Sequence, residues 1–163
     1  MDQPEHLNQD LLNHQNIVST LLLLIPNERN EEQPLHQSHL KTDGEYFDHC
    51  LYNKYEINSH AFNLIRPLLD KLNVKAIIQA RLNLLIAKET PQFSEFHVDY
   101  THGNKTAILY LNTCNGYTEF FDEKKTKVYS QENKIVIFDG QIQHRAVSQT
   151  DNKRRIVLNL NYY

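Results

Sequence analysis

The sequence predicts a mainly β domain, either a sandwich or a barrel, with supporting helices in its N-terminal part. From about residue 76 onward, short segments rich in Ile, Val, Leu and aromatic residues follow one another, separated by polar turns. Short strands with turn signals at intervals of roughly ten residues are typical of all-β sandwiches and barrels. A chain of 163 residues is expected to form one domain.

The first 75 residues differ in texture from the rest. Residues 5–25 carry Leu, Val and Ile at a loosely helical spacing that ends before Pro26, so we expect a helix there. Residues 26–45 are polar and predict a long loop. We therefore expect residues 1–75 to form helical and loop support for a core that comprises residues 76–163.

Two further elements are expected before the core begins. Residues 46–52 predict a short strand. Ser59 has the character of an N-cap for a helix that extends to Leu72. Pro67 interrupts that pattern and predicts a kink or two shorter helices.

The core is predicted to contain a succession of strands. Asn115-Gly116 is a two-residue turn signal typical of a hairpin between the second and third of them. In chain order, the predicted strands are residues 76–88, 105–112, 117–121, 126–129, 134–138, 143–148 and 155–163.

Composition excludes several classes of protein. The net charge is -3 and the pI about 6.3, so no broad basic field favours bulk nucleic-acid binding. Two cysteines, Cys50 and Cys114, exclude a disulfide-rich secreted scaffold. The acidic start lacks the character of a signal peptide, and the run 21–25 is too short to span a bilayer. We expect a cytoplasmic protein without a membrane anchor.

The chemistry is carried by His97-Val98-Asp99 and by His144. On an extended chain, residues i and i+2 point to the same face, so one imidazole and one carboxylate converge. His144 follows a strand and a tight turn, from which a neighbouring strand could return it to the same end of a barrel. Two histidines and one carboxylate on one face of an octahedron leave three positions open, as in non-haem iron(II) oxygenases.

An arginine after His144 supplies the next requirement of such a site. A 2-oxoglutarate co-substrate has a distal carboxylate, which the planar fork of a guanidinium binds well. Arg154 shares a strand face with Ile156, Leu158 and Leu160, whereas Arg155 shares one with Val157, Asn159 and Asn161. The apolar face should pack in a core and the mixed face should line a polar pocket. We therefore favour Arg155 as the anchor, with Asn159 beside it, over an exposed Arg154.

Tyr110 is a second candidate for binding the distal carboxylate of the co-substrate. It lies in the predicted strand after His97-Val98-Asp99, and its hydroxyl could reach the same carboxylate. A strand tyrosine is also a common packing residue, and Asn112 on the same face could equally form a turn.

The stretch from His97 to Tyr163 resembles the double-stranded β-helix core of the 2-oxoglutarate/iron(II) oxygenases, and within them the prolyl-hydroxylase-like branch. It also resembles small oxygenase-like proteins of bacteriophages and marine microbes. The resemblance implies a jelly-roll, cupin-like core, iron ligation by His97, Asp99 and His144, and anchoring of 2-oxoglutarate by Arg155 with Tyr110. The matching blocks are His97-Val98-Asp99, Tyr110-Leu111-Asn112, the segment 135–140, His144 and the segment 155–160.

The sequence departs from this family at one position. The family often has a tyrosine on the strand before the HxD motif that helps to hold the co-substrate, and residues 81–87 contain none. Asn83 or Arg81 is expected to take its place.

The resemblance implies an enzyme that uses Fe(II), 2-oxoglutarate and O2 to hydroxylate a C–H bond, with release of succinate and CO2. Peptidyl proline, a free amino acid or another small molecule remain open as substrates. One alternative is a non-catalytic, cupin-like ligand-binding barrel, and a second is a nucleic-acid demethylase of the same superfamily, which would want a basic groove and stacking aromatics. A zinc hydrolase is a third, but it would have no use for Arg155.

Overall fold

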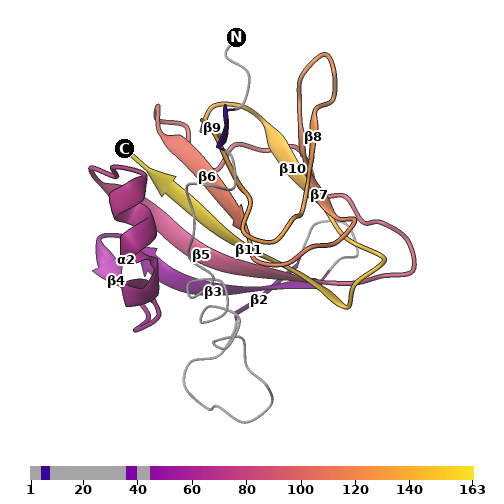
Figure 1. The fold of residues 1–163 in the computed structure, drawn as a ribbon, viewed down its shortest axis with the longest axis horizontal. Coiled ribbons are helices and arrows are strands. Elements are labelled where there is room, and N and C mark those ends of the chain that lie inside the picture. The colour runs from indigo at the N-terminus through magenta and orange to yellow at the C-terminus, as the bar shows by residue number, and fades with distance from the viewer. Residues whose placement is uncertain (1–4, 8–35, 40–44) are drawn as a thin grey trace.

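Two antiparallel sheets of unequal size face each other in the computed structural model, which describes residues 5–7, 36–39 and 45–163 (Figure 1). The larger sheet has the strand order β1-β9-β6-β11-β5-β3-β2, with β4 paired to β3. The smaller has the order β10-β7-β8. In chain order the strands are β1 (Glu5–Leu7), β2 (His36–His39), β3 (Glu45–Asn53), β4 (Glu56–Ile57), β5 (Ile77–Ile86), β6 (Lys105–Tyr110), β7 (Tyr117–Phe120), β8 (Lys127–Tyr129), β9 (Ile135–Asp139), β10 (His144–Val147) and β11 (Arg154–Tyr162).

This arrangement confirms the prediction of a mainly β, jelly-roll core. Strands that are distant in sequence become neighbours, since β11 pairs with both β5 and β6 at the centre of the larger sheet. The predicted strands of residues 76–163 are all present with small shifts at their ends. The sheet also extends into the N-terminal part of the chain, because β3 pairs with β5.

The outer face of the larger sheet is covered by helix α2 (Phe62–Lys71) (Figure 1). Phe62, Ile65 and Leu68 of this helix are buried in one apolar cluster with the outward-facing side chains of the central strands. Those side chains are Ala80 and Leu82 of β5, Ala107 and Leu109 of β6, and Ile156, Leu158 and Leu160 of β11. The described part of the chain contains no helix long and apolar enough to cross a membrane.

A second apolar cluster lies between the two sheets. Ile108 and Tyr110 of β6, Val136 and Phe138 of β9 and Val157 of β11 meet Phe120 of β7 and Val128 of β8. The larger sheet therefore presents one face to α2 and the other to the interior of the barrel. Alternation along each central strand decides which side chains enter that interior.

Several predictions for the first 75 residues need correction. The helix expected over residues 5–25 is wrong at its start, because Glu5–Leu7 form β1 and pair with β9; the remainder lies outside the described residues. The loop expected over residues 26–45 contains the strand His36–His39, which pairs with β3. Each of these short strands occupies an edge of the larger sheet, where unpaired backbone groups favour an added strand.

The capping prediction for α2 also needs correction. The N-cap is Ala61 rather than Ser59, whose hydroxyl accepts a hydrogen bond from the Ala61 amide at 3.2 Å, before the helix starts. One helix continues through Pro67, so it does not split into two.

The hairpin predicted across Asn115-Gly116 is wrong, because the strands on either side belong to different sheets. Asn115 instead connects the segment between β6 and β7 to the loop between β10 and β11, since its amide N–H donates to the Asp151 carboxylate at 2.9 Å. Its side-chain oxygen accepts from the Thr150 amide at 2.8 Å. At Gly116, a Cβ atom would lie 2.7 Å from Cδ of Arg155 and 3.0 Å from the Val147 carbonyl oxygen. The glycine is therefore required by close packing.

Replacing Gly116 by alanine is expected to lower the free energy of unfolding by about 1–3 kcal/mol, because the new methyl group must displace the buried Arg155 side chain and crowd the backbone of Val147. Gly103→Ala is the matched control, since a Cβ there meets no atom within 4 Å. Urea unfolding of both variants measures the difference. Equal midpoints for the two variants would contradict this account of Gly116.

Candidate metal centre and co-substrate pocket

Residues 92–97 run antiparallel to the free edge of β10 and thereby bring the HxD motif to His144. Isolated bridges pair Phe93 with Val147 and His97 with His144. His97 and His144 exchange both backbone hydrogen bonds, each at 3.0 Å. Ser94 reinforces the pairing, because its hydroxyl accepts a hydrogen bond from the Ala146 amide at 2.9 Å.

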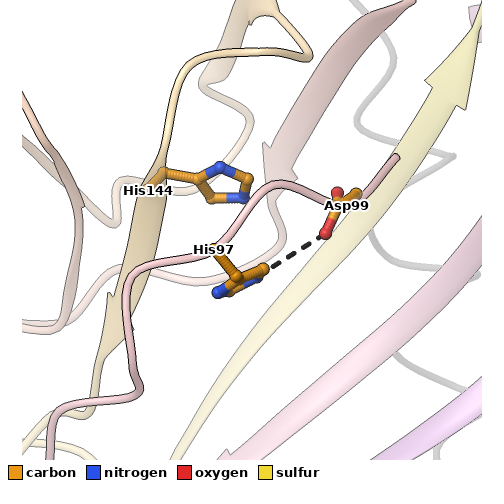
Figure 2. A group of neighbouring side chains, drawn as sticks. All are labelled: His97, Asp99 and His144. Carbon is orange, nitrogen blue, oxygen red and sulfur yellow. Dashed lines mark ion pairs between the residues drawn. The ribbon is translucent and has the colours of Figure 1, made fainter. Parts of the chain in front are cut away.

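The three predicted metal ligands gather at one place, two from the segment before β6 and one from β10 (Figure 2). One ligand atom from each of His97, Asp99 and His144 lies within 4.8 Å of the others. His97 Nε2 lies 3.6 Å from Asp99 Oδ1. Ligands of one first-row metal ion lie about 2.1 Å from it and about 3 Å from one another. Side-chain shifts of about 1–2 Å would therefore complete a facial site.

Both imidazoles are held in the tautomer that metal binding requires. His97 Nδ1 lies 2.9 Å from the Glu95 carbonyl oxygen and His144 Nδ1 lies 3.2 Å from that of Ile142. A carbonyl oxygen only accepts, so in the neutral ring each Nδ1 carries the proton and each Nε2 keeps its lone pair. Hydrogen bonds of this kind orient the histidines of metal sites.

The two histidines differ in their acid–base character. The hydrogen bond with Asp99 raises the pKa of His97, whose side chain is 47% exposed. Burial lowers the pKa of His144. Protonation at falling pH therefore begins at His97.

A chain of buried amides holds the Asp99 carboxylate. Asn159 Nδ2 donates to Asp99 Oδ2 at 3.2 Å, and Asn161 Nδ2 donates to Asn159 Oδ1 at 3.3 Å. Asn161 Oδ1 in turn accepts from the Thr106 hydroxyl at 2.8 Å. Burial acts to raise the pKa of Asp99, but the hydrogen bond with His97, the charge of His144 and the Asn159 amide together hold it well below its usual range. The carboxylate is therefore ionised, with Oδ1 directed toward His97.

A cavity of about 120 Å³ opens from the three ligands into the barrel. One buried water needs a cavity of roughly 10–15 Å³, so this cavity has room for a small organic molecule. Ile108, Val157 and Leu85 form apolar parts of its wall. Its polar lining includes Arg155 of β11 and Thr118 of β7, which bind each other. It also includes Asn159 of β11 and Asn83 and Arg81 of β5.

Arg155 lies in this cavity wall with only 1% of its surface exposed, whereas Arg154 is exposed. Its Nε donates to the Ser130 hydroxyl at 2.7 Å and its Nη2 to the Thr118 hydroxyl at 3.2 Å. No salt bridge joins it to an acidic side chain within the described ranges. A buried cation without a counter-charge is costly, and an anionic ligand would supply that charge.

Tyr110 occupies a different position from the other predicted site residues. It is fully buried, and its hydroxyl donates to the Thr118 hydroxyl at 2.9 Å, so it does not line the cavity. Its ring lies 5.6 Å from the guanidinium carbon of Arg155. Tyr110 thus contacts Arg155 and the hydroxyl of Thr118 that faces the cavity. Asn112 is bound to β11 rather than within a local turn, because its side-chain oxygen accepts from the Ile156 amide at 2.8 Å and its Nδ2 donates to the Arg154 carbonyl oxygen at 2.8 Å.

No pattern in the sequence pointed to the site residues that the smaller sheet supplies. Thr118 and Ser130 bind Arg155 across the barrel, and Arg145 forms part of the cavity wall. Arg145 Nε donates to the buried carboxylate of Glu119 at 2.6 Å, and its guanidinium lies 4.7 and 4.3 Å from the rings of Phe93 and Phe96. Alternation could have placed Thr118 on an inward face, but the partner strands of β7 were not predictable.

No protein-family model and no curated protein matches the sequence. Solved structures do match it at low identity. The epimerase SnoN in complex with Fe3+, alpha ketoglutarate and nogalamycin RO has a TM-score of 0.65 at 12% identity, over 99% of this chain and 78% of that one. A 2OG-Fe(II) oxygenase family oxidoreductase from Burkholderia pseudomallei has a TM-score of 0.60 at 12% identity, over 80% and 73% of the two chains. A Pseudomonas putida prolyl-4-hydroxylase has a TM-score of 0.53 at 14% identity, over 98% and 89%. The chain has the fold of these 2OG-Fe(II) oxygenase structures.

Proposed function

We propose that this protein is a non-haem Fe(II)- and 2-oxoglutarate-dependent dioxygenase that acts as a single domain, with residues 76–163 as its catalytic core. One observation carries the proposal: a site for a facial metal ion and a buried, uncompensated arginine open into the same cavity. A cupin-like barrel without catalysis would not need both features. A zinc hydrolase would have no use for Arg155.

The residues present fit both groups. His97, Asp99 and His144 would hold Fe(II), because two imidazole nitrogens and one carboxylate oxygen are its typical facial donors. Arg155 would hold the distal carboxylate of 2-oxoglutarate, assisted by the Thr118 hydroxyl. When bound, the metal and 2-oxoglutarate supply the oxidising chemistry that, with O2, hydroxylates a C–H bond and yields succinate and CO2.

The chain itself contributes orientation and exclusion of water. The carbonyl groups of Glu95 and Ile142 keep the Nε2 atoms of the histidines free to bind, and Asn159 fixes the rotation of Asp99. Ser130 and Thr118 fix the fork of Arg155 at the far side of the cavity. The apolar side chains of Leu85, Ile108 and Val157 in the wall would help to exclude water, which strengthens electrostatic interactions in the cavity.

The proposed reaction is hydroxylation of a small molecule or of a prolyl or other peptidyl residue. Solved structures with this fold include a prolyl hydroxylase in complex with a hypoxia inducible factor peptide fragment from Trichoplax adhaerens and an epimerase in complex with nogalamycin RO. Arg145 of the cavity wall is already paired with Glu119, so this cation is not available to a phosphate group of a nucleic acid.

Binding of Mn(II), an oxygen-stable substitute for Fe(II), is expected to weaken as the pH falls. Metal binding requires a neutral His97, and the raised pKa of this residue means that protons compete at a higher pH than for an ordinary histidine. Below that pKa, affinity should fall about tenfold per pH unit as one proton is displaced, and more steeply once His144 is also protonated. Electron paramagnetic resonance of free Mn(II) measures this. Constant affinity from about pH 8 to pH 5 would contradict the assignment.

Arg155→Gln is expected to weaken binding of 2-oxoglutarate to the Mn(II)-loaded protein by roughly tenfold to a hundredfold, because charge-assisted hydrogen bonds to the carboxylate are lost. Arg154→Gln is the matched control, since this neighbouring arginine is exposed. Calorimetric titration compares the three proteins, and thermal melting checks that each is folded. Equal affinity in the wild type and in Arg155→Gln would remove Arg155 from the co-substrate site.

A further inference from the structure

Arg81 is a second arginine in the cavity, and it lies on the side of the metal ligands. It is directly opposite Asn159 in the pairing of β5 with β11, and Asn159 binds Asp99. Arg155 lies four residues from Asn159 along β11, or about 13 Å along an extended strand. The two guanidinium groups therefore belong to different parts of the cavity, with the metal ligands nearer to Arg81.

Arg81 and Asn83 both carry polar atoms without a partner. Arg81 Nε and Asn83 Oδ1 are buried and form no hydrogen bond. The two residues are two apart on β5, so their side chains share the face that lines the cavity. Buried polar atoms are nearly always satisfied, so a bound molecule, either water or a ligand, is expected to complete this part of the cavity.

Charge balance indicates what kind of ligand this is. On the proposed function, the charges of a ferrous ion and of Arg155 balance those of Asp99 and of the two carboxylates of 2-oxoglutarate. Arg145, the other arginine of the lining, is paired with Glu119. No salt bridge connects Arg81 to an acidic side chain in the part of the chain that the structure describes. Among the described residues, Arg81 is thus a lining arginine without a salt bridge, and the buried Asp48 of β3 lies opposite the neighbouring Asn83.

We propose that Arg81 and Asn83, which the sequence predicted at the co-substrate, instead form a subsite for the primary substrate. We further propose that this substrate is a small carboxylic acid carrying an amine or hydroxyl group, such as a free amino acid. Arg81 binds the carboxylate through its guanidinium, and Asn83 Oδ1 accepts a hydrogen bond from the amine or hydroxyl. Arg81, opposite Asn159, lies on the side of the metal ligands and would hold a C–H bond of the bound acid near the reacting centre. A residue within a peptide chain lacks the free carboxylate and is disfavoured.

The test uses the full-length protein loaded with Mn(II) and saturating 2-oxoglutarate. The twenty common L-amino acids are titrated individually by calorimetry, each beside its carboxamide. We expect at least one acid to bind and its carboxamide to bind at least tenfold more weakly. Arg81→Gln should bind that acid more weakly by a similar factor, while its affinity for 2-oxoglutarate stays within about twofold of wild type. Arg81→Lys should retain part of the binding, and the exposed Arg154→Gln should behave as wild type.

Three results would overturn the subsite: no amino acid binds to the wild type, the carboxamide binds as well as the acid, or Arg81→Gln loses 2-oxoglutarate as severely as Arg155→Gln. The last would place Arg81 in the co-substrate site. Failure of the proposed function is distinguishable, because it appears as failure of the metal-loaded wild type to bind 2-oxoglutarate at all. The amino acids are then titrated against the protein loaded with Mn(II) alone, and the same comparison of Arg81→Gln with wild type decides the subsite.

Discussion

The whole site depends on the antiparallel bridge between His97 and His144. Two backbone hydrogen bonds of 3.0 Å fasten the segment that carries the HxD motif to the free edge of β10. Because the bridge fixes backbone positions, it brings the imidazoles and the Asp99 carboxylate to one place. The Nδ1 contacts and the amide chain from Asn161 through Asn159 then fix the rotation of each ligand. These contacts orient the ligand side chains, and such orientation reduces the cost of binding a metal ion.

The two faces of the central strand β11 have different roles, since one packs in the apolar core and the other lines the cavity. Its outward residues Ile156, Leu158 and Leu160 are buried under α2, and its inward residues Arg155, Val157 and Asn159 line the cavity. One strand thereby supports both the anchor proposed for 2-oxoglutarate and the amide that holds Asp99. Charge in the cavity is expensive, and the structure satisfies most of it internally: Asp99 by hydrogen bonds and Arg145 by Glu119. Among the described residues, Arg155 and Arg81 form no salt bridge, and we propose a ligand for each.

Local patterns in the sequence were enough to predict the strands of residues 76–163 and the cluster of His97, Asp99 and His144. Alternation also separated buried Arg155 from exposed Arg154, since a period of two depends only on adjacent residues. Pairing between distant strands was not predictable in this way. The partners of Arg155 on the smaller sheet, Thr118 and Ser130, come from strands whose neighbours are set by the barrel. The signal at Asn115-Gly116 failed for the same reason, because long-range packing against Arg155 and Asp151 selects these residues.

The most direct test of the proposed chemistry is an anaerobic titration of Fe(II) and 2-oxoglutarate into the metal-free protein, followed by the weak visible charge-transfer band of the chelated complex. It requires no knowledge of the substrate. The account predicts that the band appears with the wild type, persists in His60→Ala, where the histidine is exposed and outside the cavity, and is lost in His97→Ala. A folded wild-type protein that binds iron without developing this band would contradict the assignment of a 2-oxoglutarate-dependent dioxygenase.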